Sequence, residues 1–166
     1  ATQFAEHYGM ECSGMRYFNV FGPRQDPDGA YAAVIPRWIA SMIKGKDVVV
    51  FGDGETSRDF CYIENVVQAN LLAAVQSSVS ASSRHHTYNI AAGSRTSLNQ
   101  LHTILKEKLA ISLPDHVIRE AIYRDFRSGD VRHSLANIES ARKAIGYVPT
   151  HSVDSGLSVS MSWYVE

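Results

Sequence analysis

The spacing of apolar residues predicts short strands that alternate with helices along the chain. An apolar run from Met15 to Phe21 is typical of a buried strand, and the strand is expected over residues 12–20. Apolar runs at 48–51 and 87–91 predict two further strands. Residues 59–63 predict a strand that returns after 48–51 as a hairpin or small sheet.

Apolar residues three and four positions apart predict the helices between these strands. The expected helical ranges are 33–45, 64–76, 97–109 (with Ser97 as N-cap), 137–145 and 152–165. The alternation of the two element types indicates an α/β fold with some α+β character. The polar stretches 77–86 and 124–134 are expected to be loops, and 117–123 an extended segment.

The first residues, 1–8, read as the last two turns of an amphipathic helix that Gly9 ends. This helix has no start signal, so the pattern predicts a chain that is part of a longer protein. The 166 residues fit a single domain.

The composition, with 45% hydrophobic and 20% charged residues, is that of a water-soluble protein. The net charge of −1 argues against nucleic acid as a partner. The sequence has no apolar run of about 18 residues, so a membrane span is not expected. Cys12 and Cys61 are expected to be reduced residues of a cytoplasmic protein, with a disulfide as the alternative.

Several kinds of catalytic site find no support in the sequence. No His or Cys pair has metal-ligand spacing, and no Gly-x-Ser-x-Gly elbow is present. The run Gly52-Asp53-Gly54 starts like a dinucleotide fingerprint but lacks its third glycine and the helix that should follow. Metal, hydrolase and autonomous dinucleotide chemistry are therefore not predicted.

A set of donors suited to phosphate remains. Two arginines, Arg58 and Arg127, each offer a planar fork of N–H groups that would suit a diphosphate. Asp130 could accept hydrogen bonds from ribose hydroxyls. For either arginine alone, a surface ion pair with Asp59 or Asp130 is an equally good interpretation.

A further candidate lies at the end of the first predicted strand. Asn19 and Gln25 flank the turn Gly22-Pro23 there, with Arg24 between them. In an open α/β sheet, ligands bind at the carboxyl ends of the strands. An ordinary core strand followed by a polar loop is the alternative.

Four segments in this order resemble the C-terminal half of extended short-chain dehydrogenases of the Rossmann type. They are Phe18–Gln25, Ala33–Pro36, Gly52–Ile63 and Arg127–Ser134. Within that superfamily the chain is most similar to UDP-sugar 4-epimerases, especially those acting on UDP-N-acetylglucosamine or its uronic acid. The resemblance implies one substrate-binding domain over 1–166, whose residues 1–22 are the end of the parent's NAD-binding domain.

The resemblance implies roles for the first two segments. Asn19 would hold the diphosphate, and Gln25 would lie near the sugar. Ala33 and Val34 would offer backbone groups to the uracil, and Trp38 would pack beside it.

The last two segments carry further implied roles. Arg58 and Arg127 would bind the diphosphate, and Asp130 the ribose. Ser134 occupies a position that sets sugar size, where a small residue leaves room for an N-acetyl group. A role of Ser134 as N-cap of the helix that follows from Asn137 is the alternative.

The same resemblance bears on cofactor and partners. Phe18 and Val20 would touch the nicotinamide end of NAD through their backbone. The chain lacks the glycine-rich NAD turn and the Tyr-x-x-x-Lys pair of these enzymes, so it is expected to carry no catalytic residue and to bind no NAD alone. Expected partners are a UDP-sugar, an N-terminal NAD domain and, in the parent, a second subunit of a homodimer.

The full-length parent would be an NAD-dependent UDP-hexose 4-epimerase, an isomerase of nucleotide-sugar metabolism and polysaccharide biosynthesis that works through a 4-keto sugar. Two alternatives remain open at this point. One is a related nucleotide-sugar dehydratase or decarboxylase. The other is a non-catalytic module that binds UDP-sugars.

Overall fold

The computed structural model describes residues 1–29, 33–76 and 85–166, and it has the α/β fold that the sequence predicts. The described helices are α1 (Thr2–Tyr8), α2 (Val34–Ile43), α3 (Ile63–Val75), α4 (Leu98–Ser112), α5 (Glu139–Ile145) and α6 (Val153–Val165). The described strands are β1 (Cys12–Tyr17), β2 (Val20–Phe21), β3 (Val49–Phe51), β4 (Ser57–Arg58), β5 (Cys61–Tyr62), β6 (His85–Ile90), β7 (Thr96–Ser97) and β8 (Ile122–Arg124).

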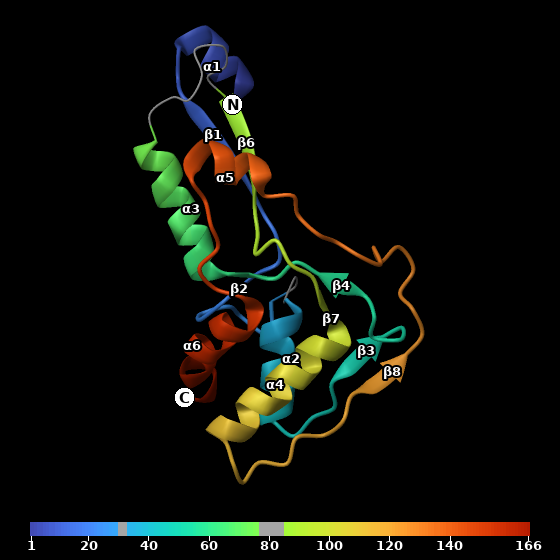
Figure 1. Cartoon of the computed structure of the whole chain (residues 1–166). Helices are drawn as coiled ribbons and strands as arrows, with labels where there is room; N and C mark the ends of the chain where they lie inside the picture. Colours follow the sequence, from blue (N-terminus) through green and yellow to red (C-terminus); the bar gives the residue numbers. More distant parts are fainter. Residues whose placement is uncertain (30–32, 77–84) are drawn as a thin grey trace.

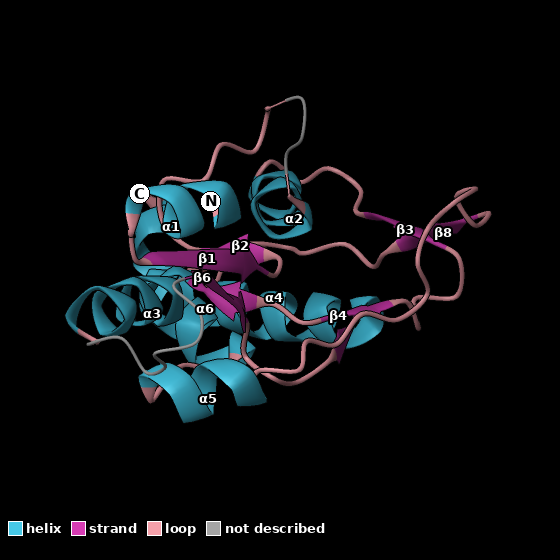
Figure 2. Ribbon diagram, turned by 90° about the horizontal axis from the view of Figure 1, so that it is seen from above, coloured by secondary structure: helices cyan, strands magenta, loops and turns pink. Residues whose placement is uncertain are grey.

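The longest strands, β1 and β6, run parallel and form one end of the molecule (Figure 1). Their register pairs Cys12 with His85 and Tyr17 with Ile90. Figure 2 shows α1 on one side of this strand pair and α3 and α5 on the other. A hydrophobic cluster that includes Ile90, Ala141 and Tyr147 joins α3 and α5 to the strand pair.

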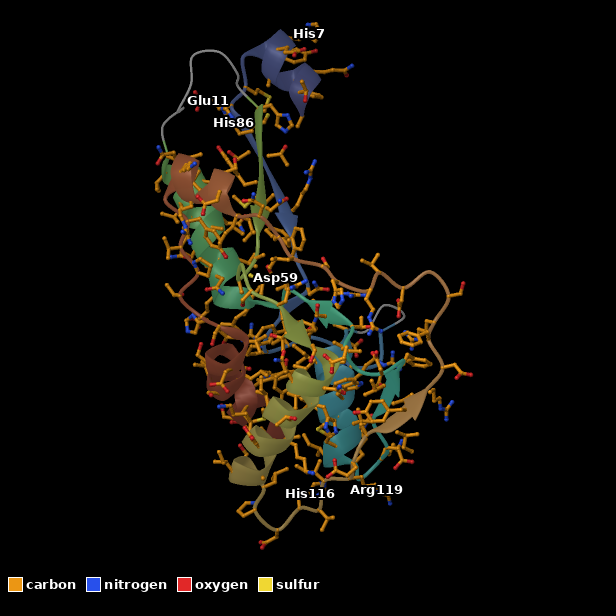
Figure 3. All side chains as sticks on the ribbon, turned by 45° about the vertical axis from the view of Figure 1, so that its right-hand side comes forward. His7, Glu11, Asp59, His86, His116 and Arg119 are labelled. Carbon is orange, nitrogen blue, oxygen red and sulfur yellow. The ribbon has the colours of Figure 1, made fainter. Side chains whose placement is uncertain are left out.

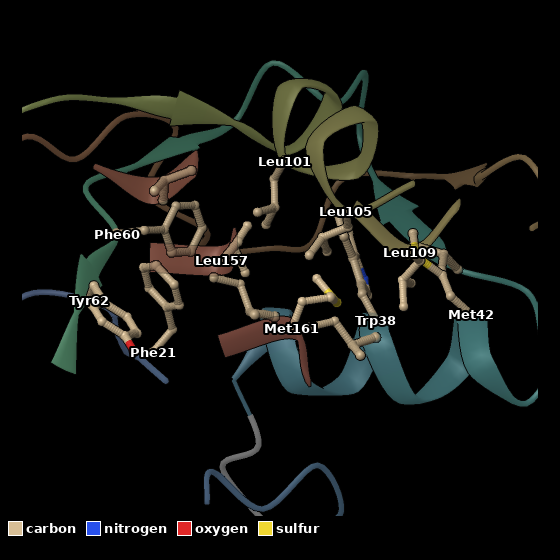
Figure 4. Packing of buried hydrophobic residues seen from close by; sticks show 14 of the residues in the cluster. Phe21, Trp38, Met42, Phe60, Tyr62, Leu101, Leu105, Leu109, Leu157 and Met161 are labelled. Carbon is tan, nitrogen blue, oxygen red and sulfur yellow. The ribbon is translucent and has the colours of Figure 1, made fainter. Parts of the chain in front are cut away.

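The other end of the molecule is built from α2, α4 and α6 around a second hydrophobic cluster. On α4, Leu101, Leu105 and Leu109 repeat every four residues and are fully buried. Figure 4 shows Leu105 of α4 beside Trp38 of α2, with Met161 of α6 between the helices. The predicted N-cap is confirmed, because the Ser97 hydroxyl accepts from the backbone N–H of Gln100 in a capping box.

The single strand predicted over 12–20 is wrong, because the chain forms two strands there. Asn19 has a φ of 36°, which a pleated strand cannot accommodate but an asparagine tolerates. The chain therefore changes direction, and β1 pairs with β6 whereas β2 pairs with β5. Apolar periodicity does not reveal a strand break at one polar residue.

The hairpin predicted between 48–51 and 59–63 is also wrong. Strand β3 pairs in parallel with β8, and β5 pairs in parallel with β2. Between them, β4 pairs antiparallel with β7. All three pairings join segments that are far apart in sequence, so local turn signals cannot predict them.

The remaining expectations agree with the described structure to within a few residues at the helix ends. Of the loop predicted at 77–86, residues 77–84 lie outside the described part of the chain, and 85–86 belong to β6 rather than to a loop. Both cysteines are free, and Cys61 is buried. In the described ranges, no helix combines the length and the apolar character needed to cross a bilayer.

Candidate functional site

A cavity of about 370 Å³ opens between the N-terminal half of α2, strands β2 to β4 and the segment that follows β8. Its volume falls in the range typical of small-molecule sites. The lining includes eight of the residues singled out in the sequence: Asn19, Val20, Ala33, Val34, Trp38, Arg58, Arg127 and Asp130. The three-dimensional structure thus collects segments from four parts of the chain around one space.

One wall of the cavity is apolar. Phe21, Trp38 and Phe60 are buried side chains that line it and also belong to the core shared with α4 and α6. The Trp38 ring is 7% exposed and meets the ring of His102 edge-on, with 6.1 Å between centroids. Because the wall is part of the core, its shape is fixed by the packing of the fold.

The cavity lining also carries positive charge. Arg37, Arg58 and Arg127 line the cavity, and none of them has an ion-pair partner among the described residues. Asp47 also lines the cavity, but it pairs with Arg119 at 3.0 Å. An anion would therefore meet more positive than negative charge in this region.

The two predicted diphosphate ligands are held by different contacts. Arg58 Nη1 donates to its neighbour's carbonyl, Ser57 O, at 2.9 Å. The guanidinium of Arg127 lies over the ring of Phe51, with Cζ 3.8 Å from the centroid. Stacking orients the planar guanidinium while leaving its N–H groups, which lie in the plane, available to an anion.

A tight turn presents Arg127 and Asp130 to the cavity together. The backbone N–H of Asp130 donates to the carbonyl of Arg127 at 3.4 Å. Gly129, the third residue of the turn, has a φ of 83°, a conformation that residues with a Cβ rarely adopt. The glycine of the Arg-x-Gly-Asp motif therefore makes possible the turn that carries both side chains.

Asp59, labelled near the centre of Figure 3, is fully buried beneath this site. Its carboxylate accepts from the backbone N–H groups of Ala92 and Gly93 at 2.9 and 3.1 Å, and from that of Ala136 at 3.3 Å. Burial raises its pKa, and these hydrogen bonds oppose the rise. The alternative in which Asp59 forms a surface ion pair with Arg58 is wrong.

The backbone of Asp59 also positions Asn19. The Asn19 side chain donates through Nδ2 to the carbonyl of Asp59 at 3.0 Å, and its own carbonyl accepts from the N–H of Cys61. These bonds hold the strand break between β1 and β2 against the 59–61 segment. Asn19 consequently lines the cavity from a defined position.

The start of α2 offers backbone donors. Ala33 is the N-cap residue, and no side chain caps the helix there. The first N–H groups of a helix have no partner within the helix and attract acceptors. Ala33 and Val34 line the cavity, so acceptors of a bound molecule could reach this region.

Three predicted residues lie outside the cavity lining. Gln25 turns back and donates through Nε2 to the carbonyl of Val20 at 3.1 Å. The backbone N–H of Ser134 donates to Ser57 O, and that of Phe18 donates to Ile90 O. These three residues therefore do not line the cavity, although Gln25 contacts Val20, which does.

The N-cap alternative for Ser134 is wrong. The N-cap residue of α5 is Ile138, and the side chain of Asn137 accepts from the N–H of Glu139 at 2.9 Å. Ser134 lies four positions before that cap, in the segment bound to β4.

Sequence reasoning missed other residues that line the cavity. Val49 and Phe51 alternate along β3 and face it, and Arg37 and Asp47 contribute charge. The 48–51 run was recognisable as a strand, but only its pairing with β8 brings it beside Arg127. Neither its spacing nor its composition reveals that partner.

No metal centre is evident in the part of the chain that the structure describes, where no group of three or more His, Cys, Asp or Glu side chains is suitably placed. The chemistry of the cavity is instead that of an anion and hydrogen-bonding site with an apolar wall.

Residues 1–91, just over half of the chain, match the sequence model of the NAD dependent epimerase/dehydratase family. The chain belongs to this family. The matched residues include β1, β2 and most of the segments that line the cavity, whereas Arg127 and Asp130 lie outside the match.

Solved structures of nucleotide-sugar epimerases have the same fold. A UDP-glucose 4-epimerase of Thermotoga maritima, solved with UDP-glucose, is 36% identical with a TM-score of 0.83 over 98% of this chain and 48% of its own. A UDP-N-acetylglucosamine 4-epimerase of Methanobrevibacter ruminantium, in complex with UDP-N-acetylmuramic acid, is also 36% identical with a TM-score of 0.83, covering 98% and 49%.

A curated relative agrees with these structures. The UDP-glucose 4-epimerase of Mycolicibacterium smegmatis is 29% identical over 95% of this chain and 46% of its own length. The chain thus spans about half the length of the relatives that it matches.

Proposed function

We propose that the cavity binds the UDP portion of a UDP-sugar, and that the chain is the substrate-binding part of an NAD-dependent UDP-sugar 4-epimerase. The observation that carries the proposal is that one cavity combines an apolar wall with two guanidiniums, Arg58 and Arg127, that have no ion-pair partner among the described residues. UDP likewise combines a flat base, which suits the apolar wall, with a negatively charged diphosphate, which suits the guanidiniums.

In this proposal each wall of the cavity binds one part of UDP. The uracil lies along Trp38 and the α2 N-terminus, where Ala33 and Val34 supply backbone groups. The ribose hydroxyls donate to Asp130. The diphosphate lies between the two guanidiniums, with Asn19 as a further donor.

The sugar would extend beyond the cavity, where Gln25 and Ser134 lie. We propose an N-acetylhexosamine of the UDP-N-acetylglucosamine type, because a small serine leaves room for the N-acetyl group. The UDP-N-acetylglucosamine 4-epimerase at 36% identity supports this assignment. None of the three relatives described above is a dehydratase or a decarboxylase.

The residues of this chain do not by themselves fit NAD. The glycine turn at 52–54 leads into strand β4 rather than a helix N-terminus, so it lacks the cradle that binds a pyrophosphate. The backbone groups proposed to face nicotinamide are engaged within the chain: Phe18 N–H with Ile90 O, and Val20 O with Gln25 Nε2. We therefore assign to this chain only the binding of the UDP-sugar's nucleotide.

Calorimetric titration tests the proposal. The chain should bind UDP more tightly than uridine, because the diphosphate adds charge-assisted bonds to Arg58 and Arg127. Arg127→Ala should weaken UDP binding about tenfold or more, since hydrogen bonds to charged groups contribute roughly 1.5–3 kcal/mol each. It should leave uridine binding nearly unchanged.

The matched control is Arg142→Ala, which removes an exposed arginine on α5 that does not line the cavity. This variant should bind UDP like the unmodified chain. Equal affinity for UDP and uridine, or an equal loss in both variants, would overturn the proposal.

A further inference from the structure

A cluster of three side chains lies next to the turn that carries Arg127. Arg132 Nη2 lies 2.5 Å from Asp53 Oδ2, and the guanidinium of Arg132 also lies over the ring of Phe126, 5.1 Å from its centroid. We call these residues the Asp53–Phe126–Arg132 cluster. It joins the glycine turn after β3 to the segment after β8.

The glycine turn is shaped to receive this cluster. A Cβ on Gly52 would lie 2.3 Å from the Phe126 ring, so only a glycine lets the ring approach so closely. Gly52 also has a φ of 82°, and its N–H donates to the carbonyl of Arg124 at 2.8 Å. The ring of Phe126 is thus seated directly on the backbone of the turn.

The cluster sits between two backbone anchors. One is the bond from Gly52 to Arg124 O, and the other is the bond from Ser57 N–H to Arg132 O at 2.9 Å. The residues between these anchors, 125–131, are all exposed, and they include the turn of Arg127 and Asp130. Side-chain contacts are therefore needed to fix that turn against the cavity.

The contribution of the cluster to global stability is small. Both partners of the Asp53–Arg132 pair are about half exposed, with side-chain exposures of 49% and 41%. Exposed ion pairs contribute little to the stability of a fold, because solvent screens the two charges. Its effect is expected in the placement of Arg127, which directly follows Phe126, rather than in the unfolding equilibrium.

We propose that Asp53, Phe126 and Arg132 are positioning residues that fix the 127–130 turn, and so hold the Arg127 guanidinium over Phe51 in the geometry that binds a diphosphate. The ligand part of this inference rests on the function proposed above. The positioning part rests on the geometry of the cluster alone.

The first test compares ligands in the Asp53→Asn and Phe126→Ala variants by calorimetry. Asparagine can still accept the backbone bond from Glu55 that forms the local turn, so Asp53→Asn removes the ion pair selectively. Each variant should weaken UDP binding about tenfold, the scale expected when a charged contact is misplaced. Uridine binding should change less than about twofold, and the melting temperature should stay near that of the unmodified chain.

The matched control is Asp154→Asn. Asp154, an exposed residue at the start of α6, pairs with Lys108 of α4 at 2.9 Å, and it does not line the cavity. This variant also loses one carboxylate charge, and it should keep the UDP affinity of the unmodified chain. Equal losses in the Asp53 and Asp154 variants would overturn the inference.

A double-mutant cycle tests the route of action. If the cluster works through Arg127, Asp53→Asn should cost little additional UDP affinity, less than about twofold, once Arg127→Ala is present. A full additional tenfold loss would show that Asp53 acts independently, and would contradict the inference.

Hydrogen exchange of the ligand-free chain separates the two levels of the claim. Asp53→Asn should raise the exchange rates of the Ser57 and Asp130 amides several-fold, while those in α4 stay unchanged. Unchanged rates at both amides would overturn the positioning role, whatever UDP does. Raised rates in a chain that binds no UDP would support the positioning role and overturn the proposed function instead.

Discussion

The buried carboxylate of Asp59 accepts hydrogen bonds from three backbone N–H groups in two other segments, at 92–93 and at 136. The backbone carbonyl of Asp59 accepts a hydrogen bond from the side chain of Asn19, which lies in a third segment. One residue therefore joins the β1–β6 end of the molecule to the segment that runs back from the cavity. The site depends on this residue although no ligand would touch it.

Asp59→Asn should destabilise the fold. The variant keeps one acceptor oxygen and places an NH₂ group against backbone donors, so at least one buried N–H loses its partner. The free energy of unfolding should fall by about 2–4 kcal/mol in urea titrations. The exposed Asp115→Asn serves as control, and equal stability of the two variants would refute this role.

The opposite directions of the Arg58 and Asp59 side chains follow from the extended backbone that both residues share. Side chains of successive residues in an extended chain point to opposite sides. Arg58 therefore faces the cavity while Asp59 faces the core. An ion pair between Arg58 and Asp59, the alternative interpretation of the sequence, would require both side chains to face the same side.

Helix α4 packs in the same hydrophobic core as the apolar wall of the cavity, and its N-cap and its range to within three residues were predicted from the sequence. Its buried face consists of the leucines at 101, 105 and 109. His102 lies on the same buried face, 8% exposed, and its Nε2 has no hydrogen-bond partner among the described residues. Periodicity alone did not single out this histidine.

The buried His102 predicts a dependence of stability on pH. Burial lowers the pKa of His102. Two charges have smaller effects on the same pKa: Glu120 raises it, and Lys106 lowers it. Below about pH 6.5, the unfolded chain binds a proton that the folded chain resists. Stability should therefore fall as the pH drops from 6.5 toward the lowered pKa of the folded state.

Urea titrations at pH 7.5 and 5.5 test this expectation. The parent chain should lose more stability on acidification than His102→Gln, which has no proton to take up. A His7→Gln variant, changed at an exposed position, should lose as much stability on acidification as the unmodified chain. The same loss in His102→Gln as in the parent would show that another group is responsible.

At the scale of the whole molecule, the sequence predicted the α/β class and which segments carry the candidate site. It did not predict the strand pairings, because β3–β8 and β4–β7 join segments separated by long stretches of chain. Those pairings place Arg127 against Phe51. Motif spacing names the residues of a site, whereas non-local pairing decides which of them meet.

The same limit explains the three residues that lie outside the cavity. Gln25, Ser134 and Phe18 belong to the same motifs as residues that line it. Each is held elsewhere by a backbone or side-chain hydrogen bond. Their proposed contacts with sugar and cofactor stay predictions.

A crystal structure of the chain with UDP tests the central claim most directly. The account predicts the diphosphate within hydrogen-bond distance, about 2.7–3.2 Å, of both Arg58 and Arg127, with the uracil beside Trp38. UDP bound instead in the shallow cavity lined by Gly93, Ala136 and Arg142 would contradict it. UDP in the first cavity with its diphosphate directed away from both arginines would contradict it equally.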